Sequence, residues 1–331
     1  MFWLNCLRIF AVTTLTLSAE PHRLFLCGAA SKGYVVGAQL PPSGLFTLTA
    51  RETWDHLGYN HPFLSSLDYD RRDPRVLYLA AGNGCIRSAD GGRTWRILTS
   101  WKVTELQDVA VDPHHPETLF IALPDGIAVS SDDGRTWNHA DSGITRKFTK
   151  TIRIDRAIKG RLLAGTELGV FLTTDNGAHW SRAAGTPEMI TAIEQSPHQP
   201  SEWLAATQSS GLYRSLDNGS SWQPVPAIPA GPTLYKIAYD PRQPRRLAVC
   251  GWGPGVLVSE DNGRTFTPRN AGLPSTRIWS VAFHPDHPGR LFAGVHEEAV
   301  FVSGDAGLHW TRRGMEGSIV QGFFFVPEAR P

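Results

Sequence analysis

Six aspartates recur along this 331-residue chain in one local pattern, Ser/Thr-x-Asp-x-Gly-x-x followed by an aromatic residue. They are Asp90, Asp132, Asp175, Asp217, Asp261 and Asp305. Two carboxylates can hydrolyse a glycosidic bond when they lie about 5–10 Å apart on either side of it. Successive aspartates are 42 to 44 residues apart, which places each one in its own repeat. Copies arranged around a common axis cannot converge on one bond, so the spacing predicts a structural role.

The other residue types in the motif suit a tight turn. The carboxylate and the Ser or Thr hydroxyl can bond to exposed backbone N–H groups, and the glycine permits a left-handed backbone conformation. The aromatic residue at the end of each copy can bury a large ring against a neighbouring sheet. These aromatic residues are Trp95, Trp137, Trp180, Trp222, Phe266 and Trp310. We therefore expect the aspartates to fix turns and the aromatic rings to fill the space between sheets.

Three further apolar runs accompany each motif in a fixed order. In the unit around Asp132 they are LQDVAVDPHHP (106–116), LFIAL (119–123) and GIAVSSD (126–132), and TWNHA (136–140) follows. The Asp-Pro step is typical of a tight turn. Each unit therefore predicts four short antiparallel strands, A to D. Such units repeated around an axis form a β-propeller, which leaves few exposed sheet edges.

The aromatic column gives the number of blades. Trp54 lies 41 residues before Trp95 and extends the column to a seventh unit, although Ala50 stands where the aspartate is expected. The last apolar run, IVQGFFFVPEA (319–329), matches an A strand but has no B, C or D strand after it. The sequence therefore predicts an all-β, seven-bladed propeller whose first blade is completed, and whose ring is closed, by strands from both termini.

The repeated motif resembles the Asp-box, or BNR repeat, of sialidases, sortilin-type receptors and related propellers, and its six copies span residues 88–310. Chain length and blade number are similar to those of photosystem II assembly-factor propellers, a resemblance that implies a non-catalytic binding or assembly role. The resemblance to sialidases and xyloglucan-hydrolysing propellers implies the alternative, a glycoside hydrolase. The chain lacks the Arg-Ile-Pro stretch of sialidases, the second ring usual in xyloglucan enzymes, and the ten blades and cysteine-rich module of sortilin-type receptors.

A blade that runs from A to D places its A–B and C–D turns on one face and its D–A and B–C loops on the other. The motifs occupy the first face, so the variable loops of the second favour ligand binding. Basic, amide and aromatic side chains gather in these loops and at the adjoining starts of the A strands: Lys102, Gln107, Arg146, Lys147, Lys150, Tyr235, Arg277 and Trp279. They suit a sugar ring, an acidic glycan or an acidic peptide. The alternative interpretation is that they are ordinary solvated cations and packing aromatics.

Aligning the A strands predicts that one residue of each blade lies near the mouth of the central channel. These residues are Ser65, Gln107, Lys150, Thr191, Tyr235, Trp279 and Gln321. The B–C loops of the same face carry the acids Asp125, Glu167, Glu297 and Glu298. They are the candidates for a catalytic acid/base pair on this face, and nothing in the sequence selects two of them.

Composition excludes some classes of partner. Lys and Arg total 32 against 31 Asp and Glu, and this net charge of +1 argues against a general affinity for nucleic acid or anionic membranes. We expect no metal site or cofactor, because His114, His115, His198, His284 and His287 fall in the A–B turns of different units. We expect a monomer that binds a protein or carbohydrate ligand.

The N-terminal segment has two interpretations. The run LRIFAVTTLTLSA (7–19) has one arginine, a short apolar core and small residues at its end, as an export signal has. Its Val, Thr and Leu residues also suit an extra strand. We therefore divide the chain into residues 1–30, a signal or an extra strand, and residues 31–331, the propeller. Export to the periplasm or medium is the preferred location and the cytoplasm is the alternative; no later run is long enough to span a bilayer.

Overall fold

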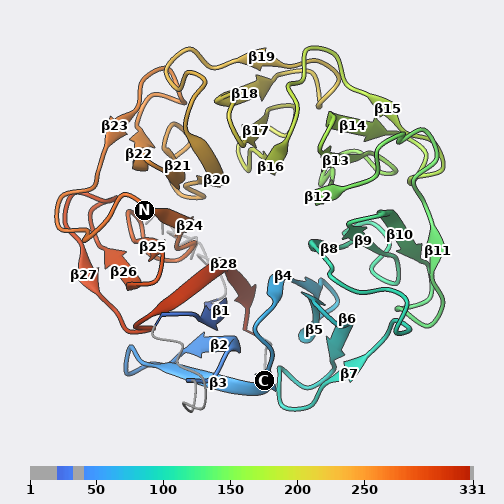
Figure 1. Ribbon diagram of the computed structural model, residues 1–331, viewed down its shortest axis with the longest axis horizontal. Coiled ribbons are helices and arrows are strands. Elements are labelled where there is room, and N and C mark those ends of the chain that lie inside the picture. Colours follow the sequence, from blue (N-terminus) through green and yellow to red (C-terminus); the bar gives the residue numbers. More distant parts are fainter. Residues whose placement is uncertain (1–20, 33–40, 329–331) are drawn as a thin grey trace, which may run out of the picture.

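The computed structural model describes residues 21–32 and 41–328 as seven four-stranded antiparallel sheets arranged around a central channel (Figure 1). The predicted seven-bladed propeller is confirmed. Within each sheet the strands follow the order A to D from the channel to the rim. None of the described residues forms a helix that could cross a membrane. The run 7–19 lies outside the described residues.

The strands have the following bounds. The A strands are β28 (Ser318–Pro327), β4 (Leu64–Asp70), β8 (Asp108–Val111), β12 (Thr149–Ile154), β16 (Ile190–Gln195), β20 (Thr233–Tyr239) and β24 (Ile278–Phe283). The B strands are β1 (His22–Ala30), β5 (Asp73–Ala81), β9 (Leu119–Leu123), β13 (Leu162–Thr166), β17 (Trp203–Thr207), β21 (Leu247–Trp252) and β25 (Leu291–Val295). The C strands are β2 (Gly44–Leu48), β6 (Gly84–Ser88), β10 (Gly126–Ser130), β14 (Gly169–Thr173), β18 (Leu212–Ser215), β22 (Gly255–Ser259) and β26 (Ala299–Ser303). The D strands are β3 (Trp54–Asn60), β7 (Arg96–Ile97), β11 (Asn138–His139), β15 (Ser181–Arg182), β19 (Gln223–Pro224), β23 (Thr267–Pro268) and β27 (Thr311–Arg312).

The first blade joins the two ends of the chain. Strand β28 pairs with β1 in an antiparallel register that runs from His22 opposite Pro327 to Ala30 opposite Ser318. The propeller therefore begins before residue 31, because residues 22–30 form the B strand of this blade. In Figure 1 the C-terminal β28 lies on the channel side of the N-terminal β1 and β2.

Apolar side chains fill the spaces between neighbouring blades. The buried residues form seven clusters, and each cluster contains or contacts one member of the aromatic column. The rings that take part are Trp310, Trp180, Trp137, Trp95, Phe266, Trp54 and Trp222. Trp54 therefore occupies the same place as the other six rings, although its blade lacks the motif aspartate. A propeller needs bulk between its diverging sheets, and the large aromatic rings supply it.

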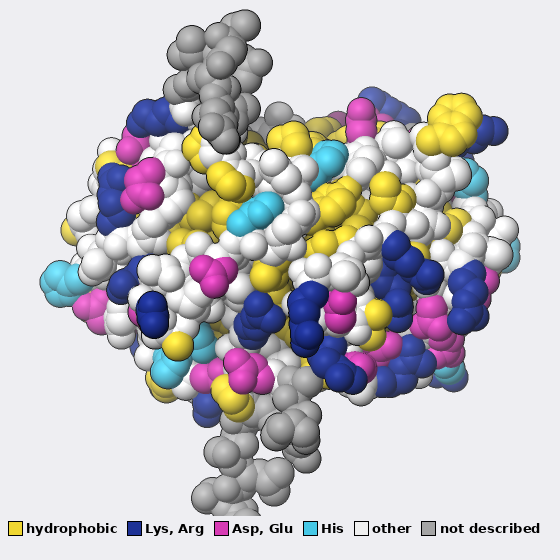
Figure 2. Space-filling model, turned by 90° about the horizontal axis from the view of Figure 1, so that it is seen from below, with side chains coloured by type: hydrophobic (Ala, Val, Ile, Leu, Met, Phe, Trp, Pro, Cys, Tyr) yellow, Lys and Arg dark blue, Asp and Glu magenta, His cyan; other side chains and the backbone are white. Residues whose placement is uncertain are grey.

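We call the side of the A–B and C–D turns the motif face and the opposite side the loop face. Viewed from the rim, basic and acidic side chains lie close to one another over the surface (Figure 2). This mixture agrees with the near-neutral charge of the chain.

Candidate functional site

Each motif aspartate is used within its own turn. The Asp132 Oδ1 accepts hydrogen bonds from the Ser130 hydroxyl (2.8 Å) and the Thr136 backbone N–H (2.8 Å), and Oδ2 accepts one from the Thr136 hydroxyl (2.7 Å). These bonds, that from the Thr136 N–H foremost, lower the pKa of Asp132 to about 2. A carboxylate held in this way is a turn anchor and a poor proton donor.

The motif glycine is required for two reasons. Gly134 has φ of 81°, a left-handed conformation that a side chain disfavours. A Cβ added there would also lie 2.4 Å from Leu98 Cδ1 of the preceding blade. The motif therefore fixes both its own turn and the approach of the neighbouring blade.

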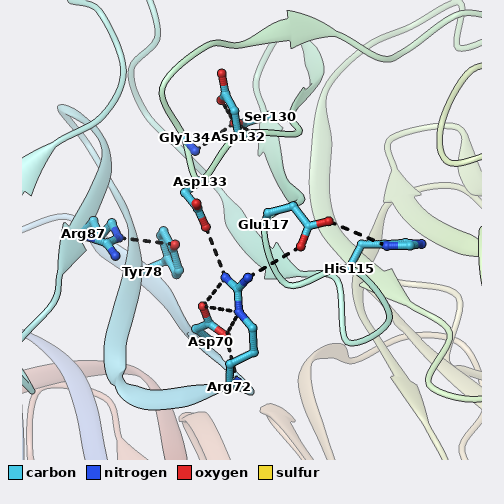
Figure 3. A network of polar contacts seen from close by, with 10 residues as sticks. All are labelled: Asp70, Arg72, Tyr78, Arg87, His115, Glu117, Ser130, Asp132, Asp133 and Gly134. Carbon is cyan, nitrogen blue, oxygen red and sulfur yellow. Dashed lines mark hydrogen bonds and ion pairs between the residues drawn. The ribbon is translucent and has the colours of Figure 1, made fainter.

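A charged network joins two blades on the motif face (Figure 3). Arg72 forms an ion pair with Asp70 of its own blade (2.6 Å) and with Asp133 of the next (3.3 Å), and lies 3.7 Å from Glu117. His115 lies 3.7 Å from the same Glu117. The Arg72 side chain is 52% exposed, so solvent screens the pairs and each contributes about 0–1 kcal/mol. We therefore give this network a structural role, the contact between two neighbouring blades.

Two histidines of the A–B turns also join blades. The His114 ring bonds to the Asp155 carbonyl oxygen at 2.9 Å, and the His198 ring bonds to the Asp240 carbonyl oxygen at 2.8 Å. In both cases the acceptor belongs to the next blade. Among residues 21–32 and 41–328 no three His, Cys, Asp or Glu side chains are grouped as a metal site would need.

Six of the seven residues of the predicted mouth column lie at a β-bulge of their A strand. The register between A and B strands shifts by one residue at Ser65, Lys150, Thr191, Tyr235, Trp279 and Gln321. Each is the extra residue of a β-bulge, a device that redirects a side chain. Gln107, the seventh member, directly precedes β8 and donates its N–H to the Ala122 carbonyl oxygen. These seven residues thus form a ring around the channel, which we call the mouth ring.

Neighbouring members of this mouth ring contact one another. The Lys150 ammonium donates to the Gln107 Oε1 at 3.0 Å, and burial together with the charge of Lys236 lowers the pKa of Lys150 to about 8. On the other side of the ring, Tyr235 stacks on Trp279 with 4.5 Å between ring centroids. The Trp279 indole N–H donates to the Gln321 Oε1 at 2.9 Å.

Two further residues, at the end of strand β21 and in the loop after β25, extend the aromatic part of the ring. The His296 ring stacks on Trp279 with 5.5 Å between centroids, and the Trp252 centroid lies 4.9 Å from that of His296. The Trp252 side chain is 38% exposed. The Arg277 guanidinium sits 5.4 Å from the Trp252 ring. We call Tyr235, Trp252, Arg277, Trp279 and His296 the mouth cluster. The sequence prediction named three of these and missed Trp252 and His296, for which the loop strings GWGPG and VHEEA were the only signal.

Three other basic residues predicted from the sequence lie outside the mouth cluster. Arg146 pairs with Glu167 at 2.6 Å, and Lys147 pairs with both oxygens of Asp141 at 3.0 and 3.1 Å. The exposed Lys102 lies 5.7 Å from the ring of Trp101, which is 83% exposed. Arg146 and Lys147 therefore already have anionic partners in the free protein.

The four candidate catalytic acids have separate surroundings. Glu167 pairs with Arg146, and Glu298 pairs with Lys32 at 2.9 Å. The bond from Lys32 lowers the pKa of Glu298, whereas a general acid at neutral pH needs a raised one. Asp125 is exposed, and Glu297 lies 4.0 Å from His296. No hydrogen bond joins two of these carboxylates in the described part of the chain, and none of the four lines the cavity in the central channel.

A cluster of charged side chains lies in the channel just below the mouth ring. The buried Asp108 accepts bonds from the Thr151 hydroxyl (2.8 Å), the Ile152 N–H (3.1 Å) and Arg153, and Arg153 reaches Glu194 at 3.0 Å. These charges come from three adjacent blades. The sequence prediction did not include them, although a charged residue within an apolar inner strand was a visible signal.

Comparison with known proteins supports the fold. No protein-family model and no curated protein sequence matches the chain. Among solved structures, the GH74 enzyme of Niastella koreensis is 17% identical with a TM-score of 0.67 over 85% of this chain and 50% of the enzyme. YCF48 from Cyanidioschyzon merolae is 15% identical with a TM-score of 0.60 over 78% of this chain and 86% of YCF48. YCF48 bound to D1 peptide is 16% identical with a TM-score of 0.58, covering 76% and 80%. The chain spans half the length of the GH74 enzyme, and identities this low establish a shared propeller fold alone.

Proposed function

We propose that this chain is a non-catalytic binding propeller that holds a protein partner at the mouth cluster on the loop face. The observation that carries the proposal is the convergence of Tyr235, Trp252, Trp279 and His296 with the exposed Arg277 at one side of the channel mouth. Aromatic and arginine side chains together are the groups that contribute most to binding at protein interfaces.

The packing of the rings favours a peptide over a sugar. A sugar ring stacks on an open aromatic face, but Trp279 is already stacked with both Tyr235 and His296, and Arg277 lies against Trp252. An exposed guanidinium beside aromatic rings suits the carboxylates and apolar side chains of a polypeptide. One structural neighbour, YCF48 bound to D1 peptide, adds support at the level of the shared fold.

The alternative function is a glycoside hydrolase, favoured by the likeness to the GH74 enzyme. It would require two convergent carboxylates on the loop face, and Glu167 and Glu298 are held by Arg146 and Lys32. Hydrolysis of xyloglucan or a sialoside by the purified chain, lost on Glu167→Gln or Glu297→Gln, would establish this alternative and exclude a binding-only role.

The proposal is tested by selecting 12-residue peptides from a phage library on the purified protein. Affinities of the selected peptides are then measured by calorimetry for wild type, Trp279→Ala and the control Trp101→Ala. We expect Trp279→Ala to weaken binding about tenfold or more, as loss of a central aromatic anchor does, and Trp101→Ala to leave it unchanged. Equal affinity of all three proteins, or no peptide selected, would contradict the proposal.

A further inference from the structure

The central channel contains a cavity of about 490 Å³. It extends from Asp108 and Lys236, just below the mouth ring, to the A–B turns at Pro113, Pro197 and Pro241 on the motif face. A volume of this size falls in the range that small-molecule sites occupy. The mouth cluster does not line it, so the cavity is distinct from the proposed peptide site.

The wall of the cavity formed by strands β8, β12, β16 and β20 carries charged side chains. It carries Asp108, Arg153, Glu194 and Lys236, and Lys150 lies directly above in the mouth ring. Arg153 pairs with both of these carboxylates. Over its whole lining the cavity has four Lys and Arg (Arg71, Arg153, Arg156, Lys236) against three Asp and Glu (Asp68, Asp108, Glu194), a net charge of +1.

Lys236 is the group in this wall that lacks a partner. Among the described residues its ammonium makes no hydrogen bond or ion pair, although Asp108 and Glu194 are close enough to act on it electrostatically. Asp108 is already occupied by Thr151, Ile152 and Arg153. Burial, together with the nearby Arg153, lowers the pKa of Lys236. Lys236 is half-buried and lines the cavity, so its ammonium is available for a charge-assisted hydrogen bond with an anionic ligand.

The wall formed by β24 and β28 is mainly apolar. Strand β28 faces β12 and β16 across the channel, and β24 faces β8 and β12 (Figure 1). Strands β24 and β28 line the cavity with Ala282, Phe323, Phe324 and Phe325. A ligand in this space therefore meets Lys236 on β20 and the aromatic rings of β28, two blades further round the channel.

We propose that the channel cavity binds an amphipathic organic anion, with its carboxylate on Lys236 and its apolar body against Phe324 and Phe325. A carboxylate would form a charge-assisted bond with the lysine, and burial of the apolar body against the phenylalanines adds hydrophobic stabilisation. The same chemistry is offered by a free apolar acid and by the C-terminal carboxylate of a peptide that ends in an apolar residue.

The probe for this site is 3-phenylpropionate, and the control ligand is its neutral amide, 3-phenylpropionamide. Calorimetry on the full chain should give saturable one-to-one binding of the acid. The amide should bind with an affinity at least about tenfold lower. Acetyl-Ala-Ala-Phe with a free or an amidated C-terminus distinguishes the source: tighter binding of the free peptide than of the small acid assigns the site to a chain terminus, and the reverse assigns it to a free acid. Equal affinities for the acid and the amide, or no binding of either, would overturn the proposal.

A variant pair locates the site. Lys236→Met should weaken the acid about tenfold or more, while Lys159→Met, the same change at an exposed lysine, should leave it unchanged. Removal of a charge that makes no hydrogen bond or ion pair among the described residues should leave Tm equal or higher, which would show that the loss of binding is not loss of fold. Equal affinity of both variants for the acid would place the ligand elsewhere. Should Lys236→Met not fold, the comparison of acid with amide on the wild type decides.

Discussion

The indole N–H of Trp54 donates a hydrogen bond to the Arg313 carbonyl oxygen at 2.7 Å, across 259 residues of sequence. Trp54 belongs to the first blade and Arg313 follows the last strand of the seventh. Glu52 reinforces the same seam through ion pairs with Arg290 (2.7 Å) and Arg313 (3.3 Å). The blade without a motif aspartate thus keeps the aromatic contact of the others and adds a charged one where the ring closes.

Trp54→Ala should lower the free energy of unfolding by about 2–4 kcal/mol, because it removes a partly buried ring from the cluster between the first and seventh blades. Urea denaturation followed by circular dichroism measures the change. The matched control is Trp101→Ala, where the ring is 83% exposed and the effect should stay within about 0.5 kcal/mol. Equal effects of the two changes would mean that Trp54 does not hold the seam.

Asp132→Ala should lower Tm and speed amide hydrogen exchange at Thr136, because the side chain accepts both the N–H and the hydroxyl of that residue. Peptide binding at the mouth cluster should be unaffected, since the turn lies on the opposite face. Asp125→Ala, at an exposed loop residue, serves as the control. A loss of binding with unchanged Tm would instead give Asp132 a functional role.

His284 should make the protein less stable as pH falls from about 6.5 to about 4. Burial, assisted by His287 and Arg290, lowers the pKa of His284 to about 4, and its neutral ring accepts the Asp286 N–H at 3.0 Å. Between an unfolded pKa of about 6.5 and the folded value, the unfolded chain binds more protons, so the free energy of unfolding decreases with falling pH.

The measurement for His284 is Tm as a function of pH for wild type and His284→Asn, whose amide oxygen can accept the same N–H. The variant should lose part of the decline between pH 6.5 and about 4, and the two curves should run parallel above pH of about 7. Parallel curves over the whole range would show that protonation of His284 does not act on folding.

The regular parts of this molecule could be predicted from the sequence. The motif glycine, aspartate and aromatic ring act within one turn or against one adjacent blade, so their spacing alone gives the blades and their number. Trp54 kept its place in the column without the aspartate because the aromatic ring, and not the carboxylate, fills the space between blades.

The site was less predictable because it depends on long-range contacts. Alignment of the A strands placed Gln107, Lys150, Tyr235 and Trp279 in one column, and the structure adds the contacts of Lys150 with Gln107 and of Tyr235 with Trp279. The contact between His296 and Trp252 depends on how β21 ends and on the path of the loop after β25, which the repeat does not fix. The charges below the mouth depend on how far Arg153 reaches across neighbouring blades, which spacing along the chain does not reveal.

The central claim, that ligand binds at the mouth cluster, is tested most directly by hydrogen–deuterium exchange of the full chain with and without the tightest selected peptide. We predict slower exchange in residues 251–254, 277–280 and 296–298, which carry Trp252, Trp279 and His296, and no change in the motif turn at 130–137. Protection of the motif turns, or of neither region, would contradict the account.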